Sequence, residues 1–398
     1  MELQKELQQK GDIPAAGKSS LWSSLFGKMD VRAYTMVGAL ILIWVLFGFL
    51  NPTFLTSRNL SNLFTQMSVT SILAIGMVLV IVAGHIDLSV GSIVGLTGGI
   101  AAILSNWLEL PAIVVILGTL AAGAVLGLLQ GWLVAYKMIP AFIVTLGGMM
   151  VFRGVLMGVT QSMTIPVSDP VLALLGNAYF AQGFGIVIGL LAVGMLLWTA
   201  YSKRRSRQKY GFEIAPLGVD IMKVSALAIL VISFVVVMNN YKGIPFPIIF
   251  VIVLAIIFYI LSTKTTFGRH IYAIGGNIEA ARLSGINIKR KTMLIFLLSG
   301  LLASIAAIVL TSRLASATIT AGNMAEMDAI AACVIGGTSL MGGAGTVIGA
   351  LIGALVMTSL DNGMSLMGLE SFWQYVVKGS ILVIAVWLDI SNRSKGVK

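Results

Sequence analysis

The side chains that could take part in chemistry lie in two short interruptions of otherwise apolar sequence, GHIDLSVG at 84–91 and GGTSLMGG at 336–343. Five polar side chains stand in them: His85, Asp87, Ser89, Thr338 and Ser339. A carboxylate and nearby hydroxyls can exchange hydrogen bonds with a polar solute. They can also cap a half-helix that follows a break in the chain. The residue types alone leave both alternatives open.

The sequence offers little for catalysis or metal binding. It has one cysteine, Cys333, and two histidines, His85 and His270. No disulfide within the chain and no Cys/His metal cluster can be built from these residues. The nearest approach to a nucleotide-binding loop, Gly11 to Ser19, has five residues between its glycines where a phosphate loop has four. We therefore expect no catalytic residue, no metal site and no cofactor bound by this chain, so it is not expected to be an enzyme.

The composition places the chain in a membrane. Hydrophobic residues make up 58% of the 398 residues and charged residues only 10%, against about 45–50% and about 25% in ordinary soluble domains. The net charge of +11 comes from basic residues between apolar segments. The positive-inside rule accounts for that pattern better than nucleic-acid binding does. We expect lipid contact, no nucleic-acid partner, and an all-α fold.

Hydropathy predicts about 10–12 transmembrane helices in a polytopic integral membrane protein, with some segments short or re-entrant. A spanning helix needs about 17–25 mostly apolar residues. Twelve candidate segments lie near 34–50, 67–83, 91–105, 111–135, 141–160, 183–200, 222–239, 246–262, 292–311, 326–340, 343–360 and 372–388.

The basic residues predict the orientation. If the N-terminus lies inside and the twelve segments cross the membrane in turn, only Arg58, Lys242 and Arg313 lie outside. The same arrangement puts 21 Lys and Arg residues inside. They are five in the N-terminal tail, Lys137, six in 202–223, six in 264–291 and three at the C-terminus. This asymmetry favours cytoplasmic termini. The remaining two, Arg153 and Lys378, fall within spans, where they can pair with carboxylates across the bundle or extend to an interface. The predicted parts are a cytoplasmic tail at 1–33, a membrane domain at 34–390 with inner loops 202–223 and 264–291, and a cytoplasmic tail at 391–398.

The two interruptions lie between short apolar segments in corresponding halves of the chain. Interrupted spans of this kind are a sequence indication of a transport pathway, although glycine-rich packing turns would give the same pattern. The break at 84–91 is predicted near the inner side, where a gate or capping role for Asp87 is favoured over a solute site. An outer loop is predicted to carry Asn362. The candidate residues of a translocation path or gate are His85, Asp87, Ser89, Thr338, Ser339 and Asn362.

Inside the inner loop 264–291 the sequence predicts one short helix at 277–285. Asn277 is a good N-cap, Glu279 suits the positive end of the helix dipole, and Gly285 can end the helix. Ala280, Ala281 and Arg282 favour helix. Two turns are marginally stable in water, so the helix is expected to lie against its own bundle or lipid, or to dock into a groove on a cytoplasmic partner.

This segment resembles the cytoplasmic motif of permeases in binding-protein-dependent ABC importers. That motif has Glu-Ala-Ala, three residues, Gly, and then nine residues to an Ile followed by Leu-Pro. The chain has Glu279-Ala280-Ala281, then Gly285, and later Ile295 and Leu297. It departs from the motif at Leu298, where the motif has proline, so the resemblance is strong at the helix and weaker at its tail.

Further motifs resemble the ribose/galactose/xylose class of sugar permeases. They are GHIDLSVG at 84–91, IVTLG at 143–147, IYAIGGN at 271–277 and ACVIGGTSL at 332–340. The resemblance extends over about 34–390. The segments 315–328, 359–365 and 372–375, with the extra basic loop 202–223, favour the subgroup that transports D-xylose.

The resemblance implies a permease subunit of the bacterial inner membrane that moves a monosaccharide inward by ATP-driven alternating access. The implied partners are a cytoplasmic ABC ATPase that uses ATP and Mg, a periplasmic sugar-binding protein and a second permease copy. It implies ATPase coupling by Asn277, Glu279, Ala280, Ala281, Arg282 and Gly285. Alternatives are another sugar (arabinose, galactose or ribose), or an ion-coupled secondary transporter, which would need no ATPase-docking helix.

Overall fold

The computed structural model describes residues 31–212 and 216–394, and it is almost entirely helical there. Within these residues nine helices are long and apolar enough to cross a membrane, which confirms the prediction of a polytopic membrane protein. Of the predicted tails, 1–30 and 395–398 lie outside the described residues. The helices are α3 (Val31–Leu50), α4 (Ser57–Val82), α5 (Val90–Ala102), the π-helical turn η1 (Ile103–Trp107), α6 (Ala112–Ala135), α7 (Ala141–Thr160), α8 (Pro170–Asn177), α9 (Gln182–Lys209), α10 (Leu217–Asn239), α11 (Phe246–Lys264), α12 (Thr266–Gly276), α13 (Ile278–Leu283), α14 (Ile288–Leu314), α15 (Ala325–Ile335), α16 (Val347–Leu366) and α17 (Ser371–Ser394).

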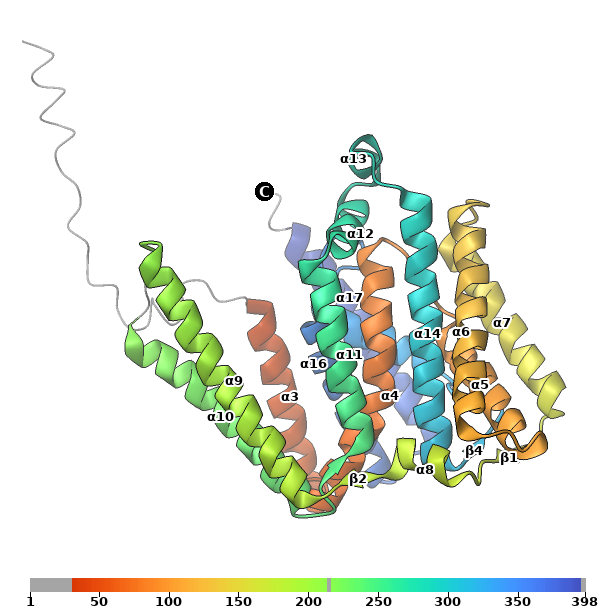
Figure 1. Cartoon of the computed structure of the whole chain (residues 1–398), viewed down its shortest axis with the longest axis horizontal. Coiled ribbons are helices and arrows are strands. Elements are labelled where there is room, and N and C mark those ends of the chain that lie inside the picture. The colour runs from red at the N-terminus through yellow and green to blue at the C-terminus, as the bar shows by residue number, and fades with distance from the viewer. Residues whose placement is uncertain (1–30, 213–215, 395–398) are drawn as a thin grey trace, which may run out of the picture. The chain divides into compact units, whose positions relative to one another are not determined.

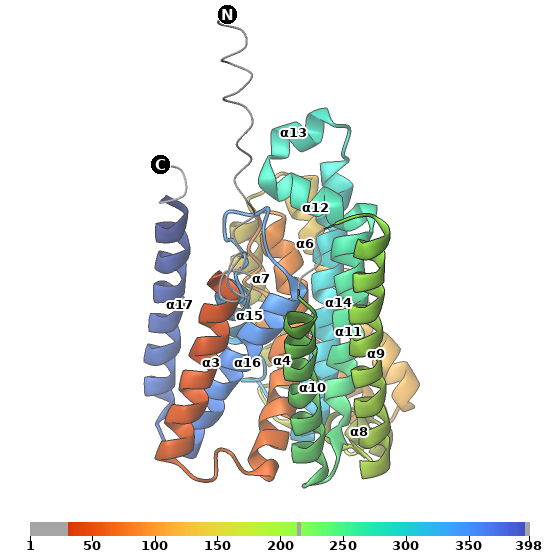
Figure 2. The same ribbon diagram turned by 90° about the vertical axis from the view of Figure 1, so that its left-hand side faces the viewer.

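The main bundle, formed by 32–187 and 234–398, is built around α4. In the most apolar 18-residue stretch of α4, 83% of the residues are buried. Helices α11, α14, α15 and α16 pack directly against it, and Figures 1 and 2 show them on several sides of α4. A helix that is apolar on all sides is expected at such a central position.

Four two-residue strands tie loops together in the main bundle. β1 (Ile165–Pro166) pairs antiparallel with β4 (Ser316–Ala317), and β2 (Tyr179–Phe180) pairs antiparallel with β3 (Ile244–Pro245). Figure 1 shows β1, β4 and α8 at one end of the bundle and α13 at the opposite end. The two ends of the bundle therefore carry different structures.

The second unit, 188–233, is a hairpin made of parts of α9 and α10. The two helices run antiparallel, and an ion pair of 2.7 Å between Arg204 and Asp220 joins them near the connecting loop. Much of the predicted inner loop 202–223 is helical, because α9 continues to Lys209 and α10 begins at Leu217. The basic residues of this segment are good helix formers, so the chain stays helical beyond its apolar part.

The interrupted segments differ from the predicted ones in length. α4 begins at Ser57, ten residues before the predicted start at 67. Its polar first turns are stabilised because the Thr56 hydroxyl caps Asn59 N–H and the Asn59 side chain bonds to Asn362. α15 has only 11 residues and ends at Ile335, so the second break runs on to Thr346. α4, which precedes the break at 84–91, is therefore a full span, whereas α15, which precedes the second break, is a short half-helix.

Two further local predictions were incomplete or wrong. The inner loop 264–291 contains a second helix, α12, capped by the Thr265 hydroxyl at Gly268 N–H. Asn362 lies in the last turns of α16 and not in an outer loop. The helix continues through this polar position because Asn362 is buried and its amide pairs with the amide of Asn59.

Candidate coupling and translocation site

The short helix predicted at 277–285 is present as α13. Asn277 is its N-cap, and its side-chain oxygen accepts the Ala280 N–H at 3.0 Å. Gly285 follows the last turn with a φ of +79°, a conformation that glycine adopts without strain. Glu279 and Arg282 form an exposed ion pair of 2.8 Å one turn apart. These contacts explain locally why so short a segment is helical.

The outer face of α13 is apolar as well as charged. Ala281 is 3% exposed and anchors the helix to the bundle, whereas the Leu283 side chain is 83% exposed and Ile278 is 49% exposed. Figure 1 shows α13 at the extreme end of the bundle, beyond the ends of the spanning helices. Apolar side chains gathered on a protruding element are typical of contacts with another protein.

The preceding helix, α12, joins α13 to both interruptions. The Gly343 N–H donates a hydrogen bond of 2.8 Å to the carbonyl oxygen of Val82, so the end of α4 meets the second break. A Cβ atom added at Gly275 would collide with that same Val82 oxygen and would lie 2.6 Å from the Gly343 nitrogen. The Tyr272 hydroxyl donates to the Gly345 carbonyl at 2.7 Å. We call Val82, Gly275 and Gly343 the glycine junction.

The first break is closed by a buried polar cluster around Asp87. One carboxylate oxygen accepts the Ser89 N–H at 2.9 Å and the Ser89 hydroxyl at 2.6 Å, and the other accepts the Ser299 hydroxyl at 3.0 Å. Asp87 and Ser89 are both 0% exposed. Three donors compensate the carboxylate for the loss of water. This arrangement fits a structural closure better than an open solute site.

Sequence reasoning missed two members of this cluster, Gln130 of α6 and Ser299 of α14. The Gln130 side-chain nitrogen lies 2.8 Å from the Ser89 hydroxyl oxygen. Gln130 is the one amide side chain in the 24-residue apolar helix α6, and that isolation could have identified it. Ser299 carries no such signal, because hydroxyls are common in spanning helices.

In the second break, Ser339 forms its hydrogen bonds with other residues of the same break. The Ser339 N–H donates to the Ala344 carbonyl at 2.8 Å, and the Ser339 hydroxyl oxygen accepts the Met341 N–H at 3.2 Å. Thr338 is buried, and its hydroxyl has no partner among the described residues. The two breaks meet through backbone at the glycine junction, and no hydrogen bond between described side chains links Thr338 or Ser339 to Asp87.

His85 lies near the end of the bundle that carries α13. Its ring lies 6.0 Å from the ring of Phe296, and burial lowers the pKa of the imidazole, which favours its neutral form at pH 7. His85 lines a hollow of about 520 Å³ together with Glu279, Arg282 and Lys289. The hollow therefore lies between α13 and the first break.

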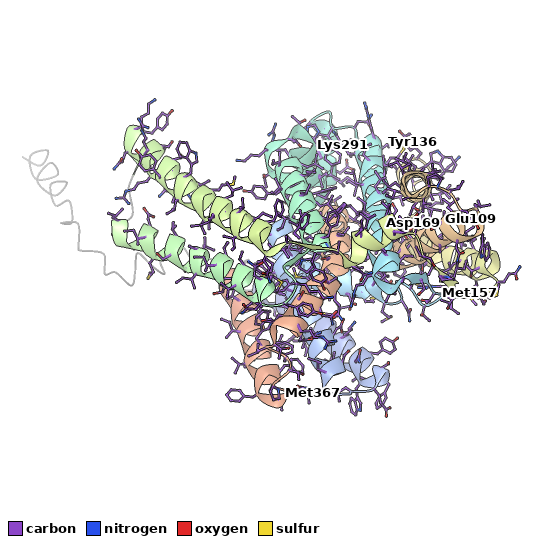
Figure 3. All side chains as sticks on the ribbon, turned by 60° about the horizontal axis from the view of Figure 1, so that its bottom comes forward. Glu109, Tyr136, Met157, Asp169, Lys291 and Met367 are labelled. Carbon is purple, nitrogen blue, oxygen red and sulfur yellow. The ribbon has the colours of Figure 1, made fainter. Side chains whose placement is uncertain are left out.

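The ends of α6 and α14 border the same hollow. Lys289 Nζ stands 5.9 Å from the centre of the Tyr136 ring, and Figure 3 shows Tyr136 and Lys291 toward this end of the bundle. This end therefore gathers α13, the first break, and the ends of two spanning helices that contribute to the Asp87 cluster.

Asn362 lies at the other end of the bundle, apart from the other predicted path residues. Its side chain and that of Asn59 exchange two hydrogen bonds, of 2.8 and 3.1 Å. Asn59 also lines a hollow of about 590 Å³ whose other walls are mostly polar or aromatic: Thr53, Thr56, Arg58, Asn62, Tyr179, Tyr241 and Leu366. The predicted path residues thus fall into two groups, one toward each end of the bundle.

The part of the chain that the structure describes contains no group of three His, Cys, Asp or Glu side chains placed to hold a metal ion. Two carboxylates, Asp328 and Asp361, share Lys378 as their ion-pair partner. The polar side chains described above therefore lie in helix breaks, cap helix ends or line hollows.

Comparisons with known proteins identify the family. The profile of the family described as "Branched-chain amino acid transport system / permease component" matches residues 59–386. The xylose transport system permease protein of Haemophilus influenzae is 47% identical over 369 residues, which is 92% of this chain and 98% of that protein. The corresponding protein of Escherichia coli K12 is 44% identical over 385 residues, covering 96% and 97%.

A more distant relative is the ribose import permease protein of Escherichia coli K12, 38% identical over 352 residues, covering 88% of this chain and 91% of that protein. No solved structure is significantly similar to the chain. The profile and the relatives describe permease components, which agrees with the prediction of a transporter subunit and not an enzyme. The chain belongs to the family of branched-chain amino acid transport system permease components.

Proposed function

We propose that the chain is the membrane permease of an ATP-driven importer that receives D-xylose from a periplasmic binding protein. Two relatives at 44–47% identity over nearly the whole chain are named xylose permeases, and a ribose permease is less similar at 38%. The family description mentions branched-chain amino acids, so an amino acid is the competing substrate to test.

The proposed partners follow from this assignment. A cytoplasmic ABC ATPase binds ATP and Mg and docks on α13, while this chain binds neither. A periplasmic sugar-binding protein meets the opposite end, and a second copy of the permease completes the transporter. The site of action is the bacterial inner membrane, with both chain termini in the cytoplasm.

The observation that carries the proposal is the continuous connection from α13 to both helix breaks. α13 follows α12 directly at Asn277, and α12 touches the ends of both interruptions at the glycine junction. A push on α13 by the closing ATPase therefore moves Gly275 against Val82 and Gly343. Packed backbone transmits such displacements because it cannot be compressed.

The breaks are proposed to form the moving part of the path. His85, Asp87 and Ser89, with Thr338 and Ser339, are proposed to form an inner gate, and the hydrogen bonds that hold Asp87 within the first break support this role. Asn362 and the polar hollow beside it are proposed as the outer entrance for the sugar, because they lie at the end of the bundle opposite α13. Opening the inner gate requires the Asp87 hydrogen bonds to rearrange, and ATPase closure supplies the bias between the two states.

The test is uptake of labelled D-xylose into proteoliposomes that contain the cognate ATPase and binding protein. Glu279→Arg together with Gly285→Pro disrupts α13, because proline cannot adopt the φ of +79° at position 285. The expected result is loss of ATPase co-purification and of uptake, with the permease still folded. Glu109→Arg, an equivalent charge reversal at an exposed position outside α13, is the control and should retain ATPase binding.

Two outcomes would contradict the proposal. Uptake by the permease alone, driven by a proton or sodium gradient, would indicate the ion-coupled alternative. Retention of ATPase binding by the double variant would remove the coupling role of α13. Competition with ribose, arabinose, galactose and leucine for uptake in the same vesicles decides the substrate. If leucine inhibits uptake and none of the sugars does, the chain would be assigned to amino-acid transport.

A further inference from the structure

The α9–α10 hairpin has no part in the coupling and translocation site, yet it carries a distinctive combination of groups. Its helices contain apolar stretches with mean hydropathies of 2.1 and 2.6. Two helices that are apolar on every side cannot cover each other completely, so hydrocarbon must cover much of the hairpin. Basic residues crowd the end of α9, at positions 203, 204, 205, 207 and 209.

Between the two helices runs a groove of about 270 Å³. Its walls are mostly apolar and include Leu197, Ala200, Leu217, Ile221 and Val224. The ion pair between Arg204 and Asp220 lies in the same groove, with an N–O distance of 2.7 Å. The groove therefore combines a hydrocarbon lining with a charged group, as an amphipathic ligand requires.

The basic residues are distributed unequally around α9. Successive residues turn by roughly 100° in an α-helix, so Arg207 follows Arg204 on nearly the same face, one turn farther along. Arg205 points to the opposite side of the helix from Arg207. The Arg204 side chain pairs with Asp220, whereas Arg207 is exposed and forms no ion pair with a carboxylate among the described residues. Arg207 does not line the groove itself, but among the described residues it is an exposed cation one turn beyond the groove-lining Arg204.

We propose that the hairpin is a binding site for one anionic phospholipid. An acyl chain lies in the groove between α9 and α10, and the phosphate contacts Arg207, with Arg204 held beside it by Asp220. A guanidinium suits this role because it can donate two parallel hydrogen bonds to phosphate oxygens. The Trp198 and Tyr201 side chains, 70% and 61% exposed, stand close to this level of the helix, where aromatic rings favour the membrane interface.

The experiment is native mass spectrometry of the purified full-length permease after detergent exchange, titrated with phosphatidylglycerol or with phosphatidylcholine. Wild type should retain one phosphatidylglycerol in preference to phosphatidylcholine. Arg207→Gln should weaken that binding about tenfold, the effect of losing one charged hydrogen-bonded contact. Arg205→Gln is the matched control, with the same change of charge two residues away on the opposite face, and should bind as wild type does.

A second pair of variants tests the acyl groove without changing any charge. Ala200→Phe fills the groove and should reduce phosphatidylglycerol binding, whereas Thr199→Phe, on another face of α9, should not. Millimolar inorganic phosphate should fail to displace the lipid, because the acyl chain supplies much of the affinity. The assay needs no ATPase, so its outcome is independent of whether the transport proposal holds.

Three results would overturn the proposal. Equal weakening by Arg205→Gln and Arg207→Gln would show diffuse charge attraction without a site. Equal binding of the two lipids would leave no role for the anionic headgroup. Loss of ATPase co-purification in Arg207→Gln with unchanged lipid binding would assign this basic end to the ATPase.

Discussion

At the scale of single residues, Asp87 is a buried carboxylate at the centre of a hydrogen-bonded cluster drawn from three parts of the chain. Ser89 belongs to the start of α5, Ser299 to α14, and Gln130 of α6 reaches the Ser89 hydroxyl. Removal of an acceptor leaves buried donors unsatisfied, at a cost of about 1–3 kcal/mol for each. The cluster therefore contributes stability to the closed break only while the acceptor is present.

Asp87→Leu should accordingly lower the thermal unfolding midpoint of the detergent-purified permease by several degrees, because the Ser89 N–H and the Ser299 hydroxyl lose their acceptor and the Ser89 hydroxyl keeps only the Gln130 side-chain oxygen, at 3.1 Å. Asp87→Asn keeps an acceptor oxygen and should lower the midpoint less, and Ser299→Ala, which removes one donor, should resemble Asp87→Asn. The measurement is thermal unfolding followed by intrinsic fluorescence. An Asp87→Leu midpoint equal to that of wild type would show that the cluster does not hold the break closed.

Two adjacent glycines give a sharper test of the coupling route. A Cβ at Gly275 would collide with the Val82 carbonyl oxygen, whereas a Cβ at Gly276 would meet no atom within 4 Å. Gly275→Ala should therefore displace α12 from the glycine junction and strongly reduce ATP-driven uptake, while ATPase binding to α13 continues. Gly276→Ala should leave uptake near the wild-type rate. Equal uptake by the two variants in proteoliposomes would exclude the junction from coupling.

Sequence reasoning succeeded at residue positions with local causes and failed at those set by distant contacts. The N-cap at Asn277 and the helix end at Gly285 depend on neighbours within four residues, and both were predicted. The contact of Gly275 with Val82 joins residues almost 200 positions apart. Nothing in either segment specifies the other, so the glycine junction was not predictable from one sequence.

At the scale of elements, a half-buried ionic group ties α17 to the bundle. Lys378 of α17 lies 3.0 Å from Asp328 of α15 and 2.8 Å from Asp361 of α16. The sequence left open whether Lys378 pairs across the bundle or extends to an interface, and the structure shows pairing. Two neighbouring carboxylates that lose their shared cation are destabilising, because the charges that remain are shielded from much of the water.

Lys378→Met should therefore lower the unfolding midpoint substantially, because two carboxylates remain close together without a cation. Addition of Asp328→Asn and Asp361→Asn to Lys378→Met should recover much of the loss, since the triple variant buries no unpaired charge. Thermal unfolding of the three-residue series measures both effects. A triple variant no more stable than Lys378→Met would show that the ion group does not stabilise the packing of α17.

Element boundaries were predicted well where apolar runs end in loops and poorly where polar residues are buried. The spans near 111–135 and 141–160 agree with α6 and α7 within a residue at each end. The start of α4 was missed because Asn59 looks like a loop residue until its partner Asn362 is known. Likewise α12 lies in a basic segment where hydropathy gives no signal.

At the scale of the whole molecule, the main bundle has two chemically different ends. One carries α12 and α13, and the other carries the short strands and the polar hollow lined by Arg58 and two tyrosines. The distribution of Lys and Arg in the sequence predicts that the α13 end is cytoplasmic. The helix order of the bundle places Arg58, Lys242 and Arg313 together near the opposite end. Sidedness itself remains a prediction, because it depends on the membrane and not on the fold.

Cysteine labelling can test that sidedness, because Cys333 is the one native cysteine and is buried. In a Cys333→Ala background, Thr53→Cys should react with a membrane-impermeant maleimide in intact cells, and Ser284→Cys should react only after the membrane is opened. Both positions are exposed, and cells without the ATPase keep α13 uncovered. Labelling of Ser284→Cys in intact cells, with Thr53→Cys protected, would invert the orientation. It would also place α13 out of reach of any cytoplasmic ATPase, so one experiment decides whether α13 stands on the side where ATP is hydrolysed.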